Sequence, residues 1–157
     1  MKGIAGAIWH GRRNVDTGMA GGRRILLVED DPEIAEMIGE ILGHEGYRLT
    51  TVATERHALA VLAGARYDLV LTDALAEPAP DEERWTVVER LLAAAEGVPV
   101  VICTAHDPRH FADFAARGFS GLIVKPFDLD DLLQPIARLL ASPRPDMPRG
   151  AGGISAE

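Results

Sequence analysis

The chain has 157 residues, a length typical of one domain. Hydrophobic residues make up 47% of it, which is enough for a buried core and excludes a wholly disordered protein. Acidic residues outnumber basic ones 24 to 16, giving a formal net charge of -8. This balance argues against a protein that binds nucleic acid through a broad basic face.

The two ends differ in composition from the middle. Residues 1–22 are rich in glycine and show no periodicity, and residues 142–157 are rich in proline and glycine. We therefore expect flexible extensions at both ends and one folded domain over residues 23–141. That domain contains 21 acidic and 11 basic residues, so the acidity belongs to the folded part, and its only lysine is Lys125.

Cysteine content and hydropathy indicate the compartment. Cys103 is the only cysteine and lies in an apolar run, so we expect a buried, reduced thiol and no internal disulfide. No stretch reaches the ~18 apolar residues of a membrane span. The sequence therefore predicts a cytoplasmic protein without membrane insertion.

Apolar runs and segments with helical spacing alternate along the middle of the chain. The runs are continuously apolar, which suits parallel strands buried on both faces. Strands are predicted at residues 25–28, 47–52, 69–71, 98–103 and 122–124. Helices are predicted over residues 32–43, 55–63, 82–95, 108–116 and 129–140.

Capping residues support these helices. Asp31 and Asp107 each precede a proline, an arrangement that favours an N-cap followed by the first helical residue. For Asp31 this favours a capping role over a role as a site acid. Thr54 and Asp128 are further candidate N-caps. Pro135 is the exception, because a proline inside a helix removes a backbone hydrogen bond.

The alternation of strands and helices predicts an α/β fold, a doubly wound five-stranded parallel sheet with helices on both faces. Because crossover connections are right-handed, the favoured strand order is 2-1-3-4-5, that of a flavodoxin-like fold.

Polar residues follow the apolar runs directly. Glu29 and Asp30 follow the first run, Asp73 the third, Thr104 the fourth and Lys125 the fifth. In such folds ligands bind beyond the carboxyl ends of the strands, so we expect these side chains to converge. Crowded carboxylates repel one another unless a cation intervenes, and oxygen ligands suit Mg²⁺. Together with an ammonium and a hydroxyl, the acids describe a site for a phosphoryl group, which a carboxylate attacks.

The segments that carry these residues resemble the receiver domain of two-component response regulators. They are residues 25–31 (ILLVEDD), 68–73 (DLVLTD), 100–105 (VVICTA) and 118–127 (GFSGLIVKPF). The resemblance implies the flavodoxin-like receiver fold, and it implies that Asp73 accepts a phosphoryl group from a histidine kinase or a histidine phosphotransfer protein. Thr104 and Lys125 would bind the phosphoryl oxygens, and Lys125–Pro126 is commonly a cis peptide in this family. The Mg²⁺ ligands would be Glu29, Asp30, Asp73 and the backbone carbonyl of Leu75.

Two positions depart from the family pattern. The family usually has an aromatic residue three positions before the lysine, where this chain has Leu122. It also follows its phosphoacceptor with a short turn containing proline and glycine, whereas residues 74–83 are longer and lack glycine. As a hypothesis, Leu75 restricts water and slows hydrolysis of the acyl phosphate.

The favoured function is a stand-alone receiver that binds a downstream protein in trans, without nucleic acid and without enzymatic activity beyond its own phosphorylation and dephosphorylation. A homodimer is left open. The alternative is a degenerate receiver that acts as a phosphorylation-independent interaction module, which Leu122 and the altered loop favour. An aspartyl-phosphate phosphatase is disfavoured because Leu75 stands where a second acid is needed. A nucleotide-binding protein is disfavoured because no glycine-rich loop follows the first run.

Overall fold

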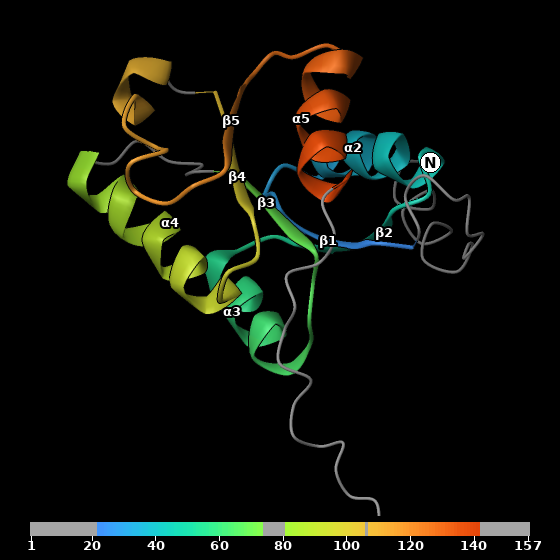
Figure 1. Ribbon diagram of the computed structural model, residues 1–157, viewed down its shortest axis with the longest axis horizontal. Helices are drawn as coiled ribbons and strands as arrows, with labels where there is room; N and C mark the ends of the chain where they lie inside the picture. The colour runs from blue at the N-terminus through green and yellow to red at the C-terminus, as the bar shows by residue number, and fades with distance from the viewer. Residues whose placement is uncertain (1–21, 74–80, 106, 142–157) are drawn as a thin grey trace, which may run out of the picture.

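Five parallel strands form the centre of the structure, a computed structural model that describes residues 22–73, 81–105 and 107–141. The strands are β1 (Arg24–Val28), β2 (Arg48–Val52), β3 (Leu69–Asp73), β4 (Val100–Thr104) and β5 (Gly121–Val124). Their order in the sheet is β2-β1-β3-β4-β5, which confirms the predicted topology (Figure 1). The predicted extensions lie outside the described residues, apart from Gly22.

Helices cover both faces of the sheet. One face carries α2 (Pro32–His44) and α5 (Leu129–Ala141), and the other carries α3 (Glu55–Gly64) and α4 (Asp81–Ala95) (Figure 1). The predicted α/β class is therefore confirmed. Within the described part of the chain, none of the helices combines the length and the apolar character needed to cross a bilayer.

The sheet divides the core into two apolar layers. Because side chains alternate along a strand, Leu26 and Ile102 pack against α3 and α4, whereas Leu27 and Cys103 pack against α2 and α5. Cys103 is buried and carries a free thiol, as predicted.

Hydrogen-bonded side chains cap the starts of α2, α3 and α5. The Asp31 carboxylate accepts hydrogen bonds from the backbone N–H groups of Glu33 (2.9 Å) and Ile34 (3.3 Å). The Thr54 hydroxyl accepts one from the backbone N–H of His57 (3.1 Å). These bonds satisfy N–H groups that have no partner inside the helix, so the predicted caps at both residues are confirmed. At the start of α5, the Asp128 carboxylate accepts a hydrogen bond from the backbone N–H of Asp131 (2.8 Å), and Pro135 lies inside this helix.

The helix predicted over residues 108–116 is wrong. The structure has a short 3₁₀ helix, η1 (Pro108–Phe111), followed by turns as far as Gly118. Most backbone hydrogen bonds of this stretch join residues three apart, for example the Phe114 N–H to the Phe111 carbonyl (3.0 Å). A helix continued from Phe111 to Phe119 would separate these residues by about 12 Å along its axis. The turns instead let both rings contact Trp85 of α4.

Candidate functional site

The strand register aligns the predicted site residues at one edge of the sheet. Glu29 and Asp30 follow the last residue of β1, and Asp73 and Thr104 are themselves the last residues of β3 and β4. Asp73 pairs with Cys103, and Lys125 follows β5 directly. Because all five strands are parallel, these positions meet at the carboxyl edge, as the sequence predicts.

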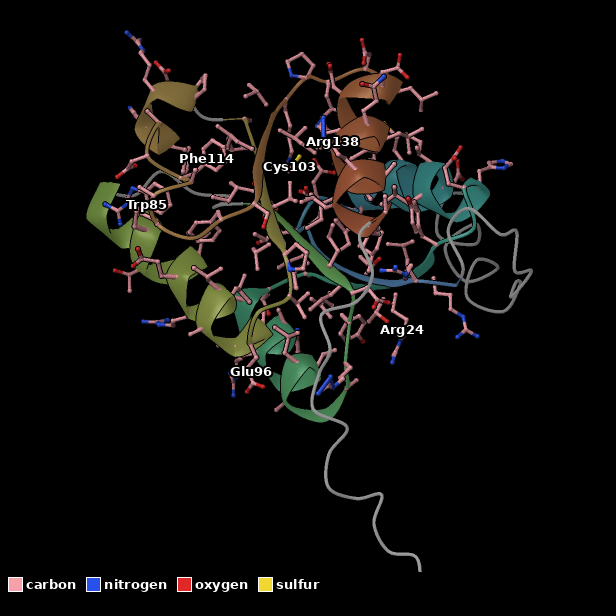
Figure 2. All side chains as sticks on the ribbon, viewed as in Figure 1. Arg24, Trp85, Glu96, Cys103, Phe114 and Arg138 are labelled. Carbon is pink, nitrogen blue, oxygen red and sulfur yellow. The ribbon has the colours of Figure 1, made fainter. Side chains whose placement is uncertain are left out.

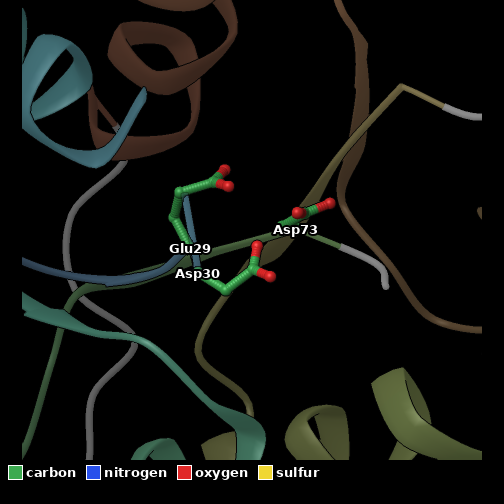
Figure 3. A group of neighbouring side chains, drawn as sticks. All are labelled: Glu29, Asp30 and Asp73. Carbon is green, nitrogen blue, oxygen red and sulfur yellow. The ribbon is translucent and has the colours of Figure 1, made fainter. Parts of the chain in front are cut away.

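Three carboxylates come together at this edge. Oxygen atoms of Glu29, Asp30 and Asp73 all lie within 4.8 Å of one another (Figure 3). Glu29 is buried, Asp30 is exposed, and Asp73 is intermediate between them. The cluster therefore extends from the interior of the domain to its surface.

Lys125 lies on the inner side of the acidic cluster. Its Nζ is 2.9 Å from Glu29 Oε1 and 3.6 Å from Asp73 Oδ2. Its backbone N–H donates to the Thr104 carbonyl (2.8 Å), and the Lys125–Pro126 peptide is cis. The lysine side chain is only 12% exposed, so its charge acts where water screens it poorly.

The charges in the site perturb one another. Burial raises the pKa of Glu29 and of Asp73 above their ordinary values, and repulsion from a neighbouring carboxylate adds to this in each case, although Lys125 opposes it. Burial disfavours the ammonium of Lys125, but its hydrogen bond to Glu29 and the charge of Asp73 outweigh burial and raise the pKa of Lys125. Burial also raises the pKa of the Cys103 thiol to about 12. The thiol is therefore an unreactive neighbour of the site.

Thr104 occupies the ladder position next to the Asp73–Cys103 pair and is fully buried. In the alternation of β4 it shares a face with Ile102, towards α3 and α4, whereas Cys103 lies on the opposite face. In β3, the hydroxyl of Thr72, the residue before Asp73, donates a hydrogen bond to the Asp73 carbonyl (3.2 Å).

A cavity of about 230 Å³ adjoins Asp73 on the side of α3 and α4. Its polar wall includes Glu29, Asp30 and Glu55, and its apolar wall includes Val87 and Leu91 of α4. The sequence shows these α4 residues only as part of a helical apolar pattern. Nothing in that pattern predicts that they approach the acids.

Of the two leucines discussed with the departures from the family pattern, the structure describes Leu122 but not Leu75. Leu122 pairs with Ile102 and packs, half-buried, against the apolar layer that includes Phe111 and Phe119. Leu75 lies outside the described residues.

The donor set suits a hard divalent cation. All three clustered acids offer carboxylate oxygens, and the exposed Asp30 leaves room for the waters that Mg²⁺ retains. The ammonium of Lys125 pairs with Glu29 and Asp73 and offsets one of the three carboxylate charges, so the cluster keeps an excess of negative charge that a cation would offset. The acidic cluster therefore fits a Mg²⁺ site.

Comparison with proteins of known sequence identifies related regulators. Residues 25–137 match the family model of the response regulator receiver domain. The transcriptional regulatory protein TcrA of Mycobacterium tuberculosis is 34% identical over 135 residues, which cover 82% of this chain and 51% of TcrA. The transcriptional regulatory protein GlrR of Escherichia coli is 31% identical over 122 residues, covering 77% of this chain and 27% of GlrR. The chain thus spans about half the length of TcrA and less of GlrR.

Solved structures show the same relationship. The chemotaxis response regulator CheY4 of Vibrio cholerae is 29% identical, with a TM-score of 0.62 over 74% of this chain and 98% of CheY4. The receiver domain of the sensor histidine kinase PA1611 from Pseudomonas aeruginosa is 28% identical, with a TM-score of 0.63 over 77% of this chain and 99% of that domain. The structure of that domain has a magnesium ion coordinated in its active site cleft. The family match includes β1 from Ile25 onwards, the other four strands in full and every predicted site residue described above, and this chain belongs to the response regulator receiver domains.

Proposed function

We propose that Asp73 is the phosphoacceptor of this receiver and takes its phosphoryl group from a phosphohistidine of a histidine kinase or a histidine phosphotransfer protein. The observation that carries the proposal is the position of its carboxylate. It lies among the acids that fit a divalent cation, and one of its oxygens is 3.6 Å from the ammonium of Lys125. A carboxylate nucleophile, a cation site and an ammonium are the groups that phosphoryl transfer requires.

In the proposed reaction, an Asp73 carboxylate oxygen bonds to phosphorus while the phosphorus–nitrogen bond to the donor histidine breaks. The leaving imidazole keeps the bonding electron pair and takes up a proton. Lys125 offsets negative charge on the phosphoryl oxygens, and the Thr104 hydroxyl donates a hydrogen bond to one of them. Glu29, Asp30 and Asp73 would hold Mg²⁺, which neutralises charge on the transferred group. A ligand role for the Leu75 carbonyl stays a prediction.

Intact mass measurement tests the phosphoacceptor. We expect the full chain, incubated with acetyl phosphate and Mg²⁺, to gain one phosphoryl group, and we expect Asp73→Asn to abolish the gain. Asp113→Asn is the matched control, because Asp113 is an exposed acid in an ion pair with Arg117, outside the acidic cluster. No adduct on the wild-type chain, alongside a receiver that does react, contradicts the proposal. An adduct that survives Asp73→Asn moves the acceptor elsewhere.

We also propose that the output of this domain is a protein bound in trans rather than DNA bound by the domain itself. The charge of residues 23–141, with 21 acidic and 11 basic residues, supports this part of the proposal. Retention of the phosphorylated chain on bulk DNA at low salt would contradict it. Light scattering with and without phosphorylation tests whether a homodimer forms.

A phosphorylation-independent interaction module is the second candidate, because Leu122 lacks the ring that the family usually has there. The two candidates predict different behaviour of Asp73→Asn. A phosphoacceptor receiver loses phosphorylation-dependent partner binding in this variant, whereas an independent module binds the partner equally well with Asp73 or Asn.

A further inference from the structure

An aromatic cluster fastens α4 to the turn segment, which we define as residues 107–119. The buried Trp85 of α4 contacts two phenylalanines of that segment. Its ring centroid is 5.3 Å from that of Phe111, at an interplanar angle of 72°, and 5.6 Å from that of Phe119. Figure 2 shows Trp85 on the side of α4 that faces the turn segment. We call Trp85, Phe111 and Phe119 the aromatic cluster.

Arg117 binds both sides of this contact. Its guanidinium lies 4.1 Å from the centroid of the Trp85 ring. It also forms ion pairs with Glu89 of α4 and with Asp113 of the turn segment, both at 2.9 Å. Cation–π contacts and paired charges of this kind hold the guanidinium in one orientation. The turn segment has little helix of its own, but it is attached firmly to α4.

The turn segment starts three residues after Thr104, to which we assign a phosphoryl contact. Thr104, the last residue of β4, is fully buried, and its carbonyl accepts the backbone N–H of Lys125 (2.8 Å). This backbone hydrogen bond joins Thr104 and Lys125, the two residues to which we assign phosphoryl contacts, at the end of β4. Leu122 stands in the position of the usual aromatic residue and contributes no ring, and it packs against the layer that contains the aromatic cluster.

We propose that a displacement of Thr104 on phosphorylation passes through the turn segment to α4 by way of the aromatic cluster. Close-packed rings do not stretch apart by small amounts, because packed interiors have discrete arrangements. A shift of Phe111 therefore either carries Trp85 and α4 with it or breaks the contact. This inference rests on the phosphoacceptor function proposed above.

Hydrogen exchange read by mass spectrometry tests this route, because one sample gives both phosphoryl occupancy and local exchange rates. In the wild-type chain we expect phosphorylation to change amide exchange by about five-fold or more, the lower end of typical coupling between sites, in both the turn segment and α4. In Trp85→Leu, compared at equal occupancy, the change within α4 should fall to about a fifth of its wild-type size or less.

A second variant keeps the test valid if Trp85→Leu does not fold. Arg117→Gln removes the guanidinium from the Trp85 ring and from Glu89, and it should also reduce the change within α4. Arg90→Gln is the matched control, because Arg90 pairs with Glu55 of α3 and ties α4 to a different element (3.4 Å). This control should keep the full change.

The outcomes separate the two proposals. If no adduct forms on the wild-type chain, the phosphoacceptor function and the inference both fail. If the adduct forms but amide exchange within α4 does not change, only the inference is overturned. The same holds if the folded variant, Trp85→Leu or Arg117→Gln, keeps the full change in exchange within α4.

Discussion

Replacement of Lys125 by methionine tests the electrostatics of the site most directly. Methionine keeps an apolar stem and removes the ammonium, which leaves the Glu29 side chain, only 2% exposed, without its partner at 2.9 Å. Removal of one partner from a buried ion pair costs about 3–5 kcal/mol of unfolding free energy. We expect about 3 kcal/mol, the lower end of that range, because Asp30 opens the cluster to solvent.

Urea unfolding of the metal-free protein measures this loss, and its pH dependence has a definite sign. Burial already raises the pKa of Glu29, and loss of the ammonium raises it further. An acid whose folded-state pKa is raised binds more protons when folded, so its unfavourable contribution grows as the pH rises through that pKa. The loss should therefore be larger at about pH 7.5 than at about pH 5.

Two further variants decide whether the loss comes from the ion pair. In the Glu29→Gln background, Lys125→Met should cost less than half as much, because the buried Glu29 charge is absent and only the longer contact of Lys125 with Asp73 (3.6 Å) is lost. Arg90→Met is the matched control, since its pair with Glu55 is solvent-exposed and should be worth within about 0.5 kcal/mol. A loss below about 1 kcal/mol for Lys125→Met, or an equal loss in the Glu29→Gln background, refutes the reasoning.

Three other predictions concern the metal site and the glycines. Mg²⁺ should raise the Tm of the metal-free protein more at about pH 7.5 than at about pH 5, because protons compete with the metal for carboxylates with raised pKa values. Asp30→Asn should reduce this rise in Tm, and an undiminished rise would contradict the proposed role of Asp30 as a metal ligand. Gly39→Ala should raise the free energy of unfolding by about 0.5–1 kcal/mol, because Gly39 lies within α2 and an added Cβ meets nothing within 4 Å; a loss in urea unfolding would count against this. Gly118→Ala should lower it by about 1–2 kcal/mol, because φ is +104° and a Cβ would lie 3.1 Å from Leu92 Cδ2; unchanged stability would show that this backbone relaxes freely.

The strands and their order could be predicted from the sequence because buried parallel strands are continuously apolar and crossovers have one hand. The meeting of Glu29, Asp73 and Lys125 followed from the same topology, since each lies at the end of a strand of one sheet or directly after it. The functional roles of these residues stay predictions.

The turn segment could not be predicted in this way. Asp107, Pro108 and the alanines after them are typical of a helix start, and η1 begins there as expected. What ends it is a tertiary contact, because Phe111 and Phe119 both pack on Trp85, which is distant in the sequence. Local propensity contains no information about such a partner, and it gives no indication that Arg117 lies over the same ring.

The scarcity of lysine in the sequence also makes Lys125 convenient for spectroscopy and selective labelling. The sequence contains one other lysine, Lys2, so lysine labelled with ¹⁵N at Nζ alone gives two signals, one of them from the ammonium beside Glu29 and Asp73. Because that ammonium is buried, ion-paired and of raised pKa, amine-reactive dyes should attach at the amino-terminal end of the chain and spare it. The intact acidic site can then be observed through one nitrogen while the molecule carries a fluorophore elsewhere.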